Sequence, residues 1–342
     1  MLLEGLHIPL TTPFHPDGRL NPHKLAANVA RYSKTPAAGL IVLGPSGEPT
    51  LLSDDETRTV LRTVAQTAAP EKVLIAGISR DSVSATLDLA EYAASLAYDT
   101  ALVGIPSMLA AESRLCELLT YFRTIADRSP LPIILLSRDK WALPVDAITE
   151  LATHPNIIAL LATDSNSAAG ILARTSAKNR EVLVTPTFAA VTTRMKNASG
   201  KATLVSAAEL SGTATAIAEP PPLPALRTRT KAVGFQILAG NTGTLIEDLR
   251  NGTTAIAPTF AASAPQACYE VFAAWKDDDQ PLADEKQIRL IEAARLAEAT
   301  PGALKFACDL NGYFGGLPRL PHLPPNGAER AALEHLMQPL RN

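Results

Sequence analysis

Residues 156–166 read NIIALLATDSN and join a short apolar run to a sequence typical of a helix start. The run has the length of a strand, and its continuous apolarity is typical of parallel strands that are buried on both faces. The Asp-Ser-Asn ending supplies residue types that cap helix N-termini. The stretch therefore predicts a buried strand that is followed by a helix.

Seven similar apolar runs occur elsewhere in the 342-residue chain. They lie at residues 6–10, 40–43, 73–76, 101–105, 133–136, 235–238 and 255–257. Their β-branched content favours strands. Most lie roughly 20–35 residues apart, which is enough for a strand, a helix and two loops. Eight such units predict an α/β fold of the (β/α)8 TIM-barrel type.

The predicted barrel occupies residues 1–262, and residues 263–342 form an additional C-terminal helical segment. The helical patterns of this segment lie near residues 264–276, 284–299 and 328–340. The chain is long enough for either one large domain or two smaller ones.

Strands six and seven are unusually far apart, and an insertion of about residues 180–231 lies between them. Its part EVLVTPTF, residues 181–188, is strand-like, and the proline-rich stretch 219–224 favours an extended connector. Long insertions are often functional. Three roles stay open for it: a subunit contact, a lid over the site, and a surface excursion.

The composition gives no support for nucleic-acid or membrane partners. The net charge is −3, with 31 basic and 34 acidic residues, and aromatic residues make up only 5% of the chain. The three cysteines form no CxxC pair, and the six histidines form no H-x-H or H-E-x-x-H pattern. We therefore expect no metal and no cofactor. No secretory leader or long apolar run is visible, so a cytoplasmic location is expected.

Four segments resemble one enzyme family in their order and spacing. They are GLHIPLTTPF (5–14), GLIVLGPSGEPTLLSDDE (39–56), KVLIAGIS (72–79) and LKFACDLNGYFGGLPRLPHLPP (304–325). Together they resemble the dihydrodipicolinate synthase/N-acetylneuraminate lyase family. The resemblance implies a barrel with C-terminal helices and a homo-oligomer, either a dimer or a tetramer. It also implies a lyase or aldolase whose strand-six lysine forms a Schiff base with a 2-keto acid such as pyruvate.

The chain departs from the family at four positions that carry this chemistry. They are Pro45, Met108, Leu136 and Leu161. The family lysine, in a motif that typically reads I-I-G-I-K-E-A-T, falls at Leu161, and a leucine has no nitrogen for an imine. The other three positions hold no hydroxyl that could relay a proton. The pattern therefore predicts a divergent member without Schiff-base chemistry, a pseudoenzyme.

A residual binding site is predicted at the carboxyl ends of the strands. Ser46 and Gly47 follow strand two, and their N–H groups are candidates for holding a substrate carboxylate. The alternative is a rim turn retained for its shape. Arg138, just after strand five, is nearest to the place of the family's carboxylate-binding arginine, and the alternative there is a solvated surface charge. The expected ligand is a small carboxylate or 2-keto acid.

Two further hypotheses stay open, and so does the question of whether the protein is an enzyme. One is an active 2-keto-acid lyase or aldolase with a relocated lysine, either Lys140 or an insertion lysine, Lys196 or Lys201. Asp139 beside Lys140 favours the ammonium form, which is not nucleophilic. The other is an enzyme with non-covalent chemistry that uses Arg194 or Lys196 of the insertion.

Overall fold

The computed structural model of the chain describes residues 1–109, 114–138, 141–163, 175, 180–200 and 226–340. Two of the candidate lysines, Lys140 and Lys201, lie outside the described residues, and so does the proline-rich stretch 219–224. Everything that follows concerns the described part of the chain.

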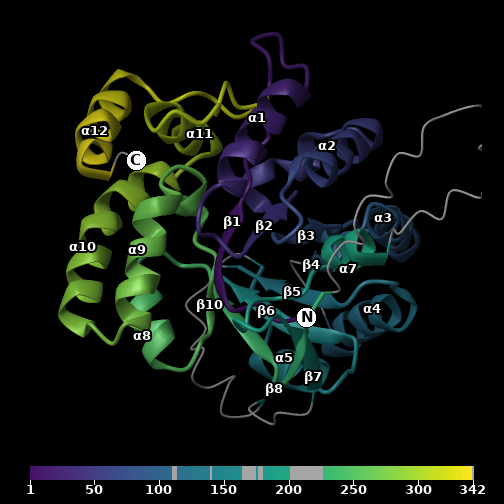
Figure 1. The fold of residues 1–342 in the computed structure, drawn as a ribbon. Coiled ribbons are helices and arrows are strands. Elements are labelled where there is room, and N and C mark those ends of the chain that lie inside the picture. The colour runs from purple at the N-terminus through teal and green to yellow at the C-terminus, as the bar shows by residue number, and fades with distance from the viewer. Residues whose placement is uncertain (110–113, 139–140, 164–174, 176–179, 201–225, 341–342) are drawn as a thin grey trace, which may run out of the picture.

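Eight parallel strands close into a barrel, which confirms the predicted (β/α)8 fold (Figure 1). The strands are β1 (Gly5–Pro9), β2 (Gly39–Val42), β3 (Val73–Gly77), β4 (Thr100–Gly104), β5 (Ile133–Ser137), β6 (Ile157–Ala162), β9 (Gln236–Ala239) and β10 (Ala255–Ile256). Their spatial order is β1-β10-β9-β6-β5-β4-β3-β2. Each of the eight apolar runs corresponds to one barrel strand.

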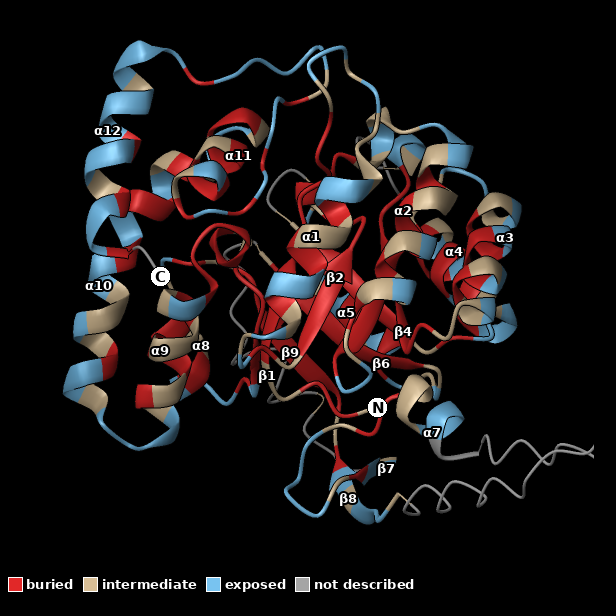
Figure 2. Ribbon diagram, turned by 45° about the horizontal axis from the view of Figure 1, so that its top comes forward, coloured by how far each residue is buried: buried red, intermediate tan, exposed pale blue. Residues whose placement is uncertain are grey.

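Helices surround the barrel and bury one face against it, with their exposed faces outward (Figure 2). Those within the barrel sequence are α1 (Pro22–Ser33), α2 (Asp54–Thr67), α3 (Val83–Ser95), α4 (Leu115–Arg128), α5 (Val145–Leu151) and α8 (Leu245–Arg250). Helix α2 begins with a full capping box, in which Ser53 and Glu56 each accept the other's backbone N–H. This cap fixes where the loop after β2 ends.

The C-terminal segment holds one helix more than the three that the sequence predicts. Its helices are α9 (Pro265–Lys276), α10 (Gln280–Ala297), α11 (Pro301–Leu310) and α12 (Gly327–Met337). The additional helix is α11, which buries six of its ten residues. None of the described helices combines the length and the apolarity needed to cross a bilayer.

The barrel interior is packed with apolar side chains. The residues of this interior cluster include Ile41, Ile75, Leu102, Ile134, Leu136, Leu161, Leu238 and Ala255. They alternate along the strands with residues that contact the outer helices, as the side-chain period of two requires. Leu161 is only 2% exposed and stands in register between Leu136 and Leu238. Leu161 is therefore part of the barrel core.

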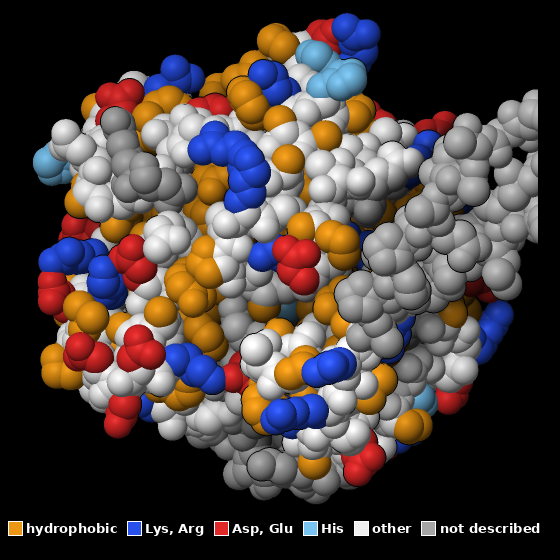
Figure 3. Space-filling view, in the orientation of Figure 1, with side chains coloured by type: hydrophobic (Ala, Val, Ile, Leu, Met, Phe, Trp, Pro, Cys, Tyr) orange, Lys and Arg blue, Asp and Glu red, His pale blue; other side chains and the backbone are white. Residues whose placement is uncertain are grey.

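The described part of the insertion forms a two-stranded antiparallel ribbon and a helix. They are β7 (Arg180–Val184), β8 (Arg229–Val233) and α7 (Thr193–Gly200). The ribbon confirms that the stretch beginning EVLV is strand-like. It lies below the barrel in the view of Figure 1, and Figure 3 shows basic side chains gathered over the same region.

Contacts of this ribbon and of α7 all lie at the amino ends of the barrel strands. The Arg180 guanidinium donates to carbonyls just before and at the start of β6, and that of Arg194 donates to Ala68 and Lys72 just before β3. The Thr193 N–H donates to Asp99, just before β4. Catalytic groups of such barrels stand at the opposite, carboxyl ends of the strands. For the described residues, the lid role and the proposed use of Arg194 at the barrel mouth are therefore wrong.

Candidate functional site

A cavity of about 610 Å³ opens at the carboxyl ends of the barrel strands. It lies off the barrel axis, over β2 to β5. The strand residues and strand ends that line it are Leu43 and Gly44 after β2, Gly77 on β3, Leu102 and Gly104 on β4, and Leu136 on β5. Cavities of this size hold ligands considerably larger than a three-carbon acid.

The loop after β2 forms one wall of the cavity. Pro45 and Glu48 line it, whereas Ser46 and Gly47 do not. The Gly47 N–H already donates to the Gly44 carbonyl at 2.9 Å within a 3-10 turn. Ser46 is buried, and its hydroxyl has no hydrogen-bond partner among the described residues. The predicted carboxylate cradle therefore does not face this cavity.

Two arginines supply positive charge to the cavity lining. Arg138, after β5, is half-buried, and its guanidinium lies 4.9 Å from the centre of the Trp141 ring. Burial lowers the pKa of Arg138 from its ordinary value, and no carboxylate among the described residues counteracts this by pairing with it. Arg80, after β3, donates to Thr57 and approaches the exposed Asp54 at 3.8 Å. Arg138 is therefore an arginine of the lining that has no carboxylate partner among the described residues.

Both acidic residues of the lining are already engaged. The Asp81 carboxylate accepts the N–H and the hydroxyl of Ser107, each at 2.6 Å, and so fixes the turn after β4. Glu48 forms an ion pair with Lys305 and accepts the Arg319 N–H at 3.0 Å. Lys305 offsets the charge of Glu48, whereas Asp81 keeps its charge. With Arg80 and Arg138 present, the described lining has a net positive charge, which favours an anion.

Of the four residues that the sequence analysis singled out, two line the cavity and two do not. Pro45 and Leu136 line the cavity, and Leu136 is 8% exposed there. Met108 is 74% exposed and outside the lining, and Leu161 is beneath it in the barrel core. No lysine is among the described residues that line the cavity. The site thus offers a ligand no amine from the described chain.

One lysine is fully buried near the mouth, and sequence reasoning missed it. Lys305, on α11, pairs with Glu48, donates to the Leu317 carbonyl at 3.1 Å and lies 4.2 Å from the centre of the Phe14 ring. Burial lowers its pKa, while the Glu48 carboxylate acts in the opposite direction. Its side chain is 0% exposed, so a ligand in the cavity does not reach it. The available signal was a single lysine within the apolar run ALKFAC.

The sequence also matches a known protein family. Residues 2–214 match the family described as the dihydrodipicolinate synthetase family. The chain belongs to this family. The match covers the first six barrel strands and part of the insertion. It includes three of the four segments that resemble the family, at residues 5–14, 39–56 and 72–79.

Full-length relatives carry the name of one enzyme. The chain is 27% identical to a 4-hydroxy-tetrahydrodipicolinate synthase of Exiguobacterium sp. over 98% of both chains. It is 26% identical to a protein of the same name from Methanothrix thermoacetophila, over 98% of this chain and 96% of that one. These likenesses extend along the C-terminal segment, beyond the family match.

Solved structures of the family share the fold. Dihydrodipicolinate synthase DapA-2 of Bacillus anthracis covers 100% of both chains with a TM-score of 0.77 and 18% identity. YagE of E. coli K12, a prophage protein of the family solved in complex with pyruvate, has a TM-score of 0.76 and 20% identity over 99% of both chains. At these identities the likeness shows the barrel fold alone.

Proposed function

We propose that this member of the dihydrodipicolinate synthetase family binds a small carboxylate, of the 2-keto-acid class, in the mouth cavity without forming a Schiff base. The observation that carries the proposal is the lining itself. It holds Arg138 without a counter-ion and no lysine among the described residues. The pyruvate complex of YagE supports the ligand class, because that protein shares the fold.

The physical argument for the ligand class rests on the guanidinium. A half-buried arginine with no carboxylate partner among the described residues has lost hydration that a ligand carboxylate can replace. An arginine also matches a carboxylate with two parallel hydrogen bonds. An imine, by contrast, requires an uncharged amine within reach of the ketone. Lys305 is enclosed by protein, and Lys196 lies on α7 at the other end of the barrel. We therefore assign binding to Arg138 and no covalent step.

Borohydride trapping tests the absence of imine chemistry. The purified protein is incubated with pyruvate and sodium borohydride and its intact mass is measured, with a lysine-bearing family enzyme treated in parallel. We expect an adduct on the parallel enzyme and none on this chain. An adduct on any lysine here would overturn the proposal, and a Lys140→Ala variant would then show whether Lys140 carries it.

Replacement of Arg138 tests the binding role. We expect Arg138→Gln to raise the dissociation constant for pyruvate by roughly 10- to 100-fold, because a charge-assisted hydrogen bond contributes about 1.5–3 kcal/mol. Isothermal titration calorimetry measures the constant. The exposed Arg128 at the end of α4 offers a matched control, since Arg128→Gln removes the same charge far from the lining. Equal losses in both variants would mean that only the net charge matters.

A further inference from the structure

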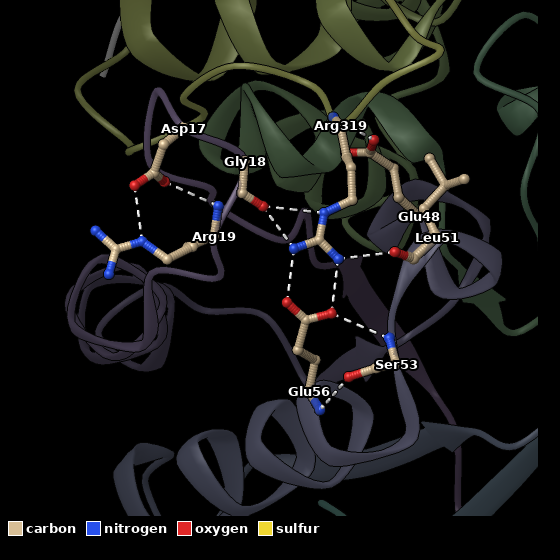
Figure 4. A network of polar contacts seen from close by, with 8 residues as sticks. All are labelled: Asp17, Gly18, Arg19, Glu48, Leu51, Ser53, Glu56 and Arg319. Carbon is tan, nitrogen blue, oxygen red and sulfur yellow. Dashed lines mark hydrogen bonds and ion pairs between the residues drawn. The ribbon is translucent and has the colours of Figure 1, made fainter.

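Arg319, in the segment between α11 and α12, reaches the loop after β2 and binds it at several points (Figure 4). Its guanidinium forms two hydrogen bonds of 2.6 Å with the Glu56 carboxylate. It also donates to the Leu51 carbonyl at 2.7 Å and to the Gly18 carbonyl at 3.1 Å. Its backbone N–H donates to Glu48 at 3.0 Å. One residue thus connects the C-terminal segment to the loop after β1, the loop after β2 and helix α2.

Glu48 is held in an unusual backbone conformation between these contacts. Its φ of 53° lies in the left-handed region, where a residue with a Cβ is strained. One carboxylate oxygen pairs with Lys305, and the other accepts the Arg319 N–H. Both partners come from the C-terminal segment. The turn at Glu48 therefore depends on residues that are remote from it in sequence.

The segment that Arg319 holds is the wall of the cavity. Glu48, Pro49, Thr50 and Leu52 line the cavity, whereas Arg319 does not. The amides of Leu51 and Leu52 hydrogen-bond back to Glu48 and Pro49 within this wall. Because Arg319 does not line the cavity, it affects a bound ligand only through the position of residues 48–52.

A second contact, independent of Arg319, also orients the Glu56 carboxylate. The carboxylate accepts the Ser53 N–H at 3.0 Å as part of the cap of α2. Loss of the guanidinium therefore leaves the cap of α2 in place and releases the stretch ahead of it. The consequence is local to residues 48–52 and to the loop after β1 at Gly18.

We propose that Arg319 is the positioning residue of the mouth cavity, which holds the wall 48–52 in its ligand-binding shape through Leu51 and Glu56. The affinity for an anion in the cavity then depends on a residue of the C-terminal segment that does not contact the anion. The choice of a small carboxylate as the ligand rests on the proposed function. The role of Arg319 in holding the wall rests only on its contacts with Leu51 and Glu56.

Hydrogen–deuterium exchange of the Arg319→Gln variant tests this directly. We expect the amides of Leu51 and Leu52 to exchange about tenfold faster than in the unaltered protein, with the exchange of α3 unchanged. Arg319→Lys keeps the charge but not the two-pronged contact, and we expect it to restore part of the protection. The control is Arg19→Gln, since Arg19 is exposed beside the same loop and pairs with Asp17. If Arg319→Gln does not fold, Glu56→Gln removes the same contact from the other side.

Pyruvate titration of the same variants separates this inference from the proposed function. Where the unaltered protein binds pyruvate, we expect Arg319→Gln to weaken binding about tenfold and Arg319→Lys to weaken it less. Faster exchange confined to the wall supports the inference even if the unaltered protein binds no pyruvate, a result that counts against the proposed function alone. Unchanged exchange of the wall, or unchanged pyruvate affinity with a loosened wall, overturns the inference.

Discussion

Glu48→Gln is expected to lower the free energy of unfolding by about 3–5 kcal/mol, the usual cost of removing one partner from a buried ion pair. The side chains of Glu48 and Lys305 are 1% and 0% exposed, so water does not replace the lost contact. The ammonium would keep only the Leu317 carbonyl and the face of the Phe14 ring. Glutamine keeps the size of the side chain, so the loss reports on charge.

Urea unfolding at pH 7 measures the effect, and Lys305→Met completes a double-mutant cycle. We expect the double variant Glu48→Gln/Lys305→Met to be more stable than Glu48→Gln alone, because it leaves no unpaired ammonium. Raising the pH should also stabilise the Glu48→Gln variant. Burial lowers the pKa of Lys305, so the folded protein loses this proton at a lower pH than the unfolded chain does. Additive losses in the two single variants would show that the pair is not coupled.

Acidification below pH 6.5 is expected to remove roughly 3 kcal/mol of stability through His7 alone. His7, on β1, is fully buried, and burial lowers its pKa from 6.5 to about 4. Its Nε2 lies 2.9 Å from the Leu3 carbonyl, while Nδ1 has no partner among the described residues. Between pH 6.5 and 4 the unfolded chain binds a proton that the folded chain does not. The contribution is therefore complete above pH 6.5 and is lost as the pH falls toward 4.

Unfolding curves at pH 7 and pH 4.5 test this for the unaltered protein and for His7→Gln. We expect the difference in stability between the two pH values to shrink by about 2–3 kcal/mol in the variant, since glutamine does not titrate. His23 is exposed and serves as the control in His23→Gln. A pH dependence that survives in His7→Gln would assign the acid sensitivity to other groups.

The barrel could be predicted because each of its strands carries a complete local signal. A strand covered on both faces is apolar throughout, and residues 157–162 show this clearly. Helix α11 was missed although the sequence carries a start signal for it, the capping residue Thr300 followed by Pro301.

The candidate site was only partly predictable. The absence of an amine at Leu161 is visible in the sequence, and Arg138 could be placed at the mouth because it follows a strand. Ser46 and Gly47 follow a strand too, yet the 3-10 turn at residues 45–47 directs them away from the cavity. Which side of a turn faces a cavity is set by packing, and local sequence does not encode it.

The sequence by itself determined the succession of the barrel strands, indicated the family and placed a leucine, Leu161, on strand six. Only the tertiary structure decided three further features: that the described insertion covers the amino ends of the strands, that Lys305 pairs with Glu48, and that Arg319 holds the wall of the cavity. The physical reason is the range of the forces involved. Strand and helix formation follows from neighbours along the chain, whereas these contacts join residues that only closure of the barrel brings together.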